Sequence, residues 1–211
     1  MLYECFLRDT LDVMRRVPGV QRSIAYLAED TSQDEVTRSY FHSLAPEMVL
    51  VPQRGHDLSE RLHHLLSDAL GGGAQQAVVM DSDSPTLPAG YVAQALQLLD
   101  GPHDVVLGPC DDGGYYLIGL KRPQPRLLRE VKMSTASVLA DTLALAAEMG
   151  LLVGLLPVWY DVDTVDDLSR LRAELSTTDA RVAQHTRAFL PSIGLAQDIR
   201  HAGVPHYSSA E

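Results

Sequence analysis

The chain has 211 residues, and its 17 lysines and arginines against 28 aspartates and glutamates give a formal net charge of -11. Since 45% of the residues are hydrophobic and 21% are charged, the chain can bury a core, which excludes a disordered tail protein. An acidic chain lacks the clustered cations that neutralise phosphates, so no nucleic-acid partner is expected. Two cysteines, Cys5 and Cys110, are too few for a disulfide framework and favour a reducing, cytoplasmic location.

No segment of the sequence is typical of a secretory signal or a membrane span. The first residues carry Glu4, Arg8 and Asp9 and lack the long apolar segment of a secretory signal. The most apolar region, 143–159, is interrupted by charge, glycine and proline, whereas a membrane span is longer and cleaner.

The first half of the chain alternates helical and strand patterns. In chain order it predicts a helix over 2–17 closed by Pro18 and Gly19, a strand over 23–28, a helix over 34–44, a strand over 48–51, a helix over 58–70 capped by Asp57, and a strand over 77–80. The glycine run at 71–73 marks a helix end and a turn.

The second half continues the alternation. It predicts a helix over 89–99, strands over 104–108 and 115–120, a helix from Ser134 or Thr135 to 149, a strand over 151–156, a helix over 164–175, a last helix over 177–190 and a frayed tail over 201–211. Strands separated by helices imply right-handed crossovers, so we expect an α/β fold with a mostly parallel, doubly wound sheet.

Acidic residues follow three of the predicted strands directly. They are Asp81 and Asp83 in VVMDSDSP, Asp111 and Asp112 in VVLGPCDDGGYYLIGL, and Asp161 and Asp163 in PVWYDVDTVDDL. Ligands of such sheets bind outside the carboxyl ends of the strands. Two unit charges about 4 Å apart repel by about 4 kcal/mol at an effective dielectric near 20, so a cluster of this kind is unfavourable unless a cation or a proton compensates the charge. Carboxylate oxygens suit Mg²⁺ or Mn²⁺.

Each of these residues also has a purely structural explanation. An aspartate after a strand often belongs to a turn or caps a helix. Thr164 and Asp167 have the spacing of a capping box, so the segment around Asp163 could simply begin a helix. Asp57 suits a helix cap better than a ligand, and Gly113 and Gly114 could make a turn or admit a ligand close to the backbone.

Five segments together resemble a known family. They are PQRGHDLSERL at 52–62, VVMDSDSPTLP at 78–88, VVLGPCDDGGYYLIGL at 105–120, STASVLADT at 134–142 and WYDVDTVDDLSRL at 159–171. This set resembles the bacterial glycosyltransferase-like family of the GT-A (nucleotide-diphospho-sugar transferase) superfamily, in its arsenosugar-biosynthesis or radical-enzyme-associated group. The resemblance implies a three-layer, Rossmann-like GT-A domain over 1–190, followed by a C-terminal tail over 191–211.

The resemblance also implies site residues. Asp83, supported by Asp81, matches the acidic metal motif, and Asp163 resembles the late acidic residue that completes the metal site. Asp112 would act as general base or accept sugar hydroxyls. The remaining nucleotide- or sugar-binding candidates are Gln53, Gly55, Asp57, Gly113, Gly114, Ser134 and Thr135, the last two because a helix N-terminus suits an anionic group.

The beginning of the chain departs from that family's pattern. Members of the family usually start with a strand and a basic, glycine-rich loop, and this chain begins at the helix that follows them. We therefore expect an N-terminally truncated fold whose sheet has an unpaired edge, a feature that favours self-association into a homo-oligomer.

Four functions compete at this point. The first is transfer of a sugar from a nucleotide-diphospho-sugar to a small acceptor with Mg²⁺ or Mn²⁺. The second is nucleotidyl transfer onto a phosphorylated small molecule. A phosphatase of the haloacid dehalogenase type is disfavoured, because Pro85 stands where that motif has threonine or valine. The fourth is a truncated, catalytically silent binding domain.

Overall fold

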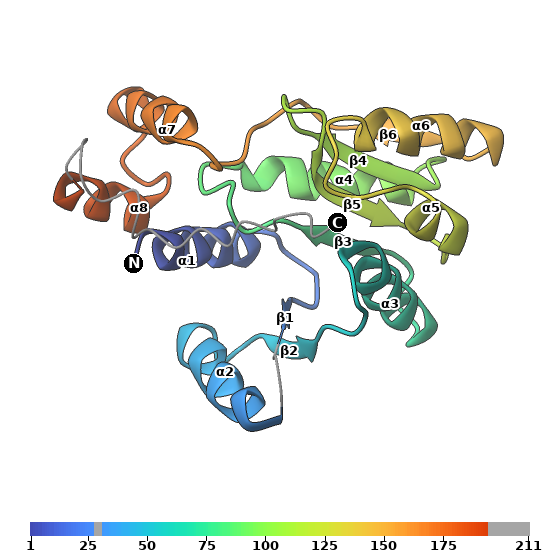
Figure 1. The fold of residues 1–211 in the computed structure, drawn as a ribbon, viewed down its shortest axis with the longest axis horizontal. Coiled ribbons are helices and arrows are strands. Elements are labelled where there is room, and N and C mark those ends of the chain that lie inside the picture. The colour runs from blue at the N-terminus through green and yellow to red at the C-terminus, as the bar shows by residue number, and fades with distance from the viewer. Residues whose placement is uncertain (28–30, 194–211) are drawn as a thin grey trace. The chain divides into compact units, whose positions relative to one another are not determined.

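The computed structural model describes residues 1–27 and 31–193 (Figure 1). The predicted tail from 194 onward and the last residue of the predicted strand over 23–28 lie outside these residues. The chain divides into two compact units: one comprises Met1–Val13, Ser82–Leu87 and the residues from Asp161 onward, and the other comprises Met14–Asp81 and Pro88–Tyr160. The predicted extent of the domain, 1–190, stays a prediction.

The larger unit holds all the strands of the described residues. β1 (Ser23–Tyr26) pairs in parallel with β2 (Val49–Pro52). A four-stranded sheet has the order β3-β5-β4-β6, with β3 at Ala77–Met80, β5 at Tyr115–Leu120, β4 at Val105–Pro109 and β6 at Val153–Leu155 (Figure 1).

Strand directions show that the four-stranded sheet is mixed, with three strands in one direction and one reversed strand. β5 is antiparallel to both β3 and β4, whereas β6 is parallel to β4. β3, β4 and β6 therefore share one direction, and β5 returns through a short turn at Gly113 and Gly114 instead of a helical crossover.

Helices cover the two faces of this sheet, as a three-layer fold requires. The larger unit contains α2 (Thr31–Leu44), α3 (Leu58–Gly71), α4 (Ala89–Asp100), α5 (Pro125–Arg129) and α6 (Val138–Glu148). Leu66 of α3, Leu127 of α5 and Ala146 of α6 join one buried cluster with Leu107 and Ile118 of the sheet. α4 covers the opposite face, where its buried Leu99 packs so closely on Gly119 that a β-carbon there would lie 2.9 Å from the leucine Cδ1.

The smaller unit is built from helices and one loop. It contains residues 1–13 of α1 (Leu2–Arg15), the loop at 82–87, α7 (Val165–Thr177), α8 (Gln184–Phe189) and the 3₁₀ turn η1 (Leu190–Ser192). The buried carboxylate of Asp9 caps α8 by accepting the N–H groups of His185 at 3.0 Å and Thr186 at 2.9 Å. These two hydrogen bonds tie α1 to α8.

Two predicted helices differ most from the structure in their extent. α6 begins at Val138, because Ser134 has a left-handed φ of 58° and residues 135–138 form a turn in which the Val138 N–H donates to the Thr135 oxygen. Ser134 and Thr135 therefore do not lie at a helix N-terminus. The predicted last helix over 177–190 is reduced to α8, because Ala183 is left-handed with a φ of 47°. The short helix α5, which begins with Pro125, was not predicted.

Candidate functional site

Asp83 and Asp163 are brought together in the smaller unit. The Val162 N–H donates to the Asp83 carbonyl oxygen at 3.0 Å, which joins the loop at 82–87 to the segment before α7. Asp83 is partly buried and Asp163 is exposed. Burial, together with the nearby charge of Asp163, raises the pKa of the Asp83 carboxyl above its ordinary value. Burial and a nearby negative charge both disfavour the ionised form of a carboxyl group.

The loop that carries Asp83 is anchored to the first helix of the chain. The hydroxyls of Tyr3 and Ser82 are 2.8 Å apart, and the Thr10 hydroxyl donates to the Ser82 carbonyl oxygen at 3.5 Å. Further along the loop, the buried Thr86 donates its hydroxyl proton to Glu174 of α7 at 3.1 Å. α1 and α7 therefore hold the backbone on both sides of Asp83.

Asp163 lies just outside the cap of α7. Thr164 is the N-cap, its hydroxyl oxygen accepts the Asp167 N–H at 3.2 Å, and the Thr164 N–H donates to the Asp167 carboxylate at 2.9 Å. The predicted capping box is thus confirmed. Because the box uses Thr164 and Asp167, capping does not account for the carboxylate of Asp163.

In the larger unit, the carboxyl ends of the strands carry a second group of predicted residues. Asp81 follows β3 and donates its N–H to the Tyr116 oxygen of β5 at 2.9 Å. After β4, the Asp111 N–H donates to the Trp159 oxygen at 3.2 Å, and the Trp159 N–H donates to the Pro109 oxygen at 2.9 Å. The segment after β6 therefore runs beside the segment that leads to Asp112.

Asp112, Gly113 and Gly114 form one ordered turn. The exposed Asp112 accepts the Gly114 N–H on Oδ1 at 2.8 Å. Gly113 has a left-handed φ of 96°, and a β-carbon on it would lie 2.0 Å from the carbonyl oxygen of Ala136. This contact brings the turn against Ala136, which follows the predicted Ser134 and Thr135 in the chain.

The structure gives a structural role to each of three predicted binding residues, Gln53, Gly55 and Asp57. The Gln53 side chain donates to the Ala25 oxygen of β1 at 3.1 Å. Gly55 has a φ of 129°, and a β-carbon there would lie 2.6 Å from the Glu60 Cβ. Asp57 caps α3 by accepting the Glu60 N–H at 2.8 Å. Their predicted contact with a nucleotide or sugar stays a prediction.

Sequence reasoning missed two arrangements. Trp159 packs against Tyr91 edge to face, with ring centroids 5.7 Å apart, beside the segment that leads to Asp112. Asp9, Asp12 and His185 converge in the smaller unit. Trp159 could have been named as a candidate site residue from the sequence, because it is the single tryptophan of the chain. No sequence signal links Asp9 to His185, since the two are far apart in the chain.

A family model described as "Uncharacterized protein conserved in bacteria (DUF2064)" matches residues 10–135. A crystal structure of a "putative nucleotide-diphospho-sugar transferase" from Desulfovibrio desulfuricans G20 is 33% identical in sequence and superposes with a TM-score of 0.81. The match covers 91% of this chain and 81% of that one. No curated protein sequence matches the chain.

More distant structures share the fold. CMP:2-keto-3-deoxy-manno-octonic acid synthetase complexed with CTP is 13% identical with a TM-score of 0.54, covering 81% of this chain and 87% of its own. A manganese complex of a Mycobacterium tuberculosis H37Rv protein is 19% identical with a TM-score of 0.51, covering 79% and 85%. Within the described residues, no helix is long and apolar enough to cross a membrane. The chain has the nucleotide-diphospho-sugar transferase fold and belongs to the DUF2064 family.

Proposed function

We propose that the chain is a cytoplasmic glycosyltransferase that moves a sugar from a nucleotide-diphospho-sugar to the hydroxyl of a small acceptor. The observation that carries the proposal is the partly buried Asp83, whose pKa is raised by burial and by the charge of Asp163. Perturbed carboxyl groups of this kind concentrate at functional sites. The relative from Desulfovibrio desulfuricans G20, named for nucleotide-diphospho-sugar transfer, supports the assignment.

The two carboxylates fit a divalent cation. A partly dehydrated carboxylate beside a second negative charge is unfavourable by itself, and a bound Mg²⁺ or Mn²⁺ removes that repulsion. Asp83 and Asp163 would hold the ion, and the role of Asp81 in the larger unit stays a prediction from the family resemblance. The manganese complex among the structures of similar fold supports this choice of metal. When bound, the ion would neutralise charge on a diphosphate leaving group.

Asp112 is the proposed general base. In the transfer, the acceptor oxygen forms a bond to the anomeric carbon, the bond from that carbon to the diphosphate oxygen breaks, and the acceptor proton passes to a carboxylate. Asp112 is exposed, and the Gly114 N–H fixes one of its oxygens at 2.8 Å. Its carboxylate is therefore oriented without being buried, which suits a group that meets a substrate hydroxyl.

Sugar and nucleotide contacts are proposed for the adjoining turns. Gly113 and Gly114 offer backbone without side chains, and Ser134 and Thr135 add hydroxyls in the turn that packs on Gly113. The Thr135 hydroxyl donates to the Lys132 oxygen at 3.3 Å, so it can still accept a bond from a ligand. The remaining residues for which we propose a contact with the nucleotide or sugar are Gln53, Gly55 and Asp57.

The test is a panel of nucleotide-diphospho-sugars incubated with the full chain, Mn²⁺ and a mixture of small alcohols and sugars. We expect release of nucleoside diphosphate that needs the metal and falls at least tenfold in Asp83→Asn and Asp163→Asn. Asp166→Asn is the matched control, because Asp166 is an exposed carboxylate in the first turn of α7 outside the capping box.

The products separate the competing functions. Glycosyl transfer releases nucleoside diphosphate, whereas nucleotidyl transfer, tested in a parallel incubation with nucleoside triphosphates and sugar phosphates, releases pyrophosphate. Release of pyrophosphate, or Mn²⁺ binding that is the same in Asp83→Asn and the parent chain, would contradict the proposal.

A further inference from the structure

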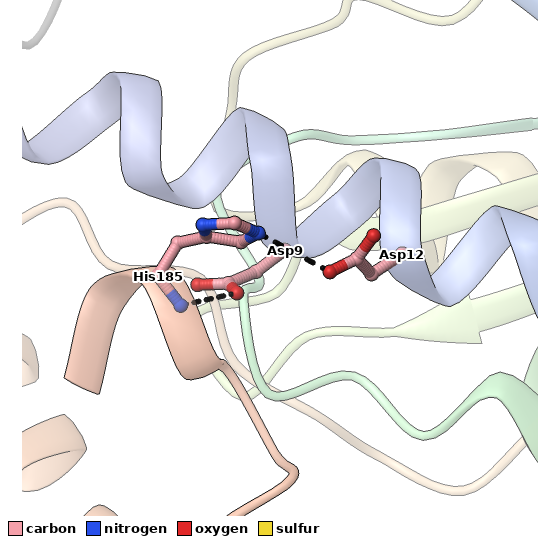
Figure 2. A group of neighbouring side chains, drawn as sticks. All are labelled: Asp9, Asp12 and His185. Carbon is pink, nitrogen blue, oxygen red and sulfur yellow. Dashed lines mark hydrogen bonds and ion pairs between the residues drawn. The ribbon is translucent and has the colours of Figure 1, made fainter. Parts of the chain in front are cut away.

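Two carboxylates and one imidazole that the proposed transfer reaction does not use converge in the smaller unit. Asp9 and Asp12 lie on α1, and His185 lies in the first turn of α8 (Figure 2). One ligand atom from each residue lies within 4.8 Å of the other two. The His185 Nε2 is 3.3 Å from the Asp12 Oδ2. Ligand atoms around a tetrahedral zinc ion are about 3 to 4 Å apart, so small side-chain movements would complete such a site.

The backbone already orients two of the three groups. Both Asp9 oxygens accept N–H groups of α8, one from His185, which Figure 2 shows, and one from Thr186. The Asp9 side chain is buried. A carboxylate oxygen has two acceptor positions, so each Asp9 oxygen keeps one for an ion. The same bonds fix the backbone of His185, which places its ring beside Asp12.

A buried hydroxyl next to the group also lacks a partner. Thr186 is fully buried, its N–H donates to Asp9 at 2.9 Å, and its Oγ1 has no hydrogen bond among the described residues. Buried polar atoms are normally satisfied by protein or by an ordered water. An ion at Asp9 that carries a water molecule would supply a partner for this hydroxyl.

We propose that Asp9, Asp12 and His185 bind a divalent transition-metal ion, Zn²⁺ in the first instance. The imidazole selects zinc over magnesium, because Mg²⁺ prefers an all-oxygen shell. Three protein ligands leave one position of a tetrahedral ion for water. The ion would clamp α8 to α1, the helix whose Tyr3 and Thr10 hold the loop at 82–87. The site would thereby stabilise the unit that carries Asp83, as a structural ion separate from the metal of the transfer reaction.

The test is zinc binding to the full chain after chelation, measured by calorimetry, with the visible absorption of Co²⁺ as a second readout. We expect Asp12→Asn and His185→Gln to weaken Zn²⁺ binding at least tenfold and to remove the Co²⁺ absorption bands. Both side chains are partly exposed, and His185→Gln keeps the backbone N–H that Asp9 accepts, so the fold should survive. Far-UV circular dichroism checks this.

Two comparisons make the outcome decisive. Asp83→Asn should keep the zinc site, which separates this proposal from the metal of the proposed transferase. Asp166→Asn controls for the loss of one negative charge. The proposal is overturned if zinc binds no more tightly than about 100 µM, a dissociation free energy near 5.5 kcal/mol. It is equally overturned if His185→Gln and Asp12→Asn bind zinc as the parent chain does.

Discussion

The N–H of Val162 donates a 3.0 Å hydrogen bond to the carbonyl oxygen of Asp83. This single bond brings Asp163 to Asp83 across a long stretch of sequence, and it does so through the backbone. The side-chain charges are therefore held near each other, and burial of Asp83 together with the charge of Asp163 raises the pKa of Asp83. The protein tolerates this repulsion at the place where the proposed metal would bind.

Replacing Asp83 with asparagine should stabilise the metal-free protein at neutral pH. Because the folded-state pKa of Asp83 is raised above its unfolded value, the group favours folding only below the unfolded pKa, and this contribution is lost as the pH rises through the folded pKa. Asparagine never ionises. We expect Asp83→Asn to melt higher in chelator at pH 7, by about 2 to 4 °C for each kcal/mol gained, and to show no such gain near pH 3.

The control for this measurement is Asp166→Asn. Asp166 is exposed in the first turn of α7, where a negative charge favours the helix, so its removal should leave stability unchanged or slightly lower. Mn²⁺ should raise the melting temperature of the parent chain and of Asp166→Asn but not that of Asp83→Asn. A lower melting temperature for Asp83→Asn than for the parent in chelator at pH 7 contradicts the electrostatic argument.

Gly113→Ala should be strongly destabilising. Its left-handed φ of 96° disfavours any side chain, and the added β-carbon would lie 2.0 Å from the backbone oxygen of Ala136. Backbone strain of this kind costs about 1 to 3 kcal/mol before the clash is counted. We expect urea unfolding to show that the free energy of unfolding falls by about 3 kcal/mol or more.

Gly150→Ala separates the cost of the left-handed backbone from the cost of the clash with Ala136. Gly150 also has a left-handed φ, 69°, but a β-carbon there meets nothing within 4 Å. We expect Gly150→Ala to lower the free energy of unfolding by only about 1 to 2 kcal/mol. Equal losses for the two variants would show that the Gly113 turn does not pack on the 134–137 segment as described.

The sequence predicted strands and capped helices better than turns. β3 and β5 have the predicted bounds, and Asp57 and Thr164 cap the predicted helices, because a short apolar run or a cap spacing is a local signal. The helix predicted from Ser134 begins only at Val138, because the left-handed φ of Ser134 arises where its segment packs on Gly113. The helix propensity of the local sequence cannot predict that contact, because it depends on a segment distant in the chain.

The same contrast applies to the site residues. The sequence alone predicts that Asp83 and Asp163 lie close together. The prediction uses the rule that ligands bind beyond the carboxyl ends of strands, together with the family resemblance. Asp9 and His185 could not be paired. Their hydrogen bond depends on how α8 packs against α1, and α8 is too short to give a periodic pattern.

Thr164→Ala should weaken the start of α7. The variant loses the hydroxyl that accepts the Asp167 N–H, and loss of an N-cap side chain costs about 0.5 to 2 kcal/mol. Thr177→Ala is the matched control, because Thr177 is an exposed threonine in the last turn of the same helix, where its hydroxyl donates to the Glu174 oxygen. Urea unfolding should show the larger loss for Thr164→Ala; an equal or smaller loss would mean that the capping box contributes little.

Trp159 should report sugar binding at the turn that holds Asp112. It is the single tryptophan of the chain, and its backbone pairs with Pro109 and Asp111 just before that turn. Its indole Nε1 is buried and lacks a hydrogen-bond partner among the described residues, so its emission should respond to a polar group that arrives nearby. We expect a nucleotide-diphospho-sugar to change the emission more than the matching nucleoside diphosphate does. Asp112→Asn should abolish that difference, whereas Asp141→Asn, an exposed carboxylate of α6, should retain it. If both variants respond as the parent chain does, Asp112 does not contact the sugar.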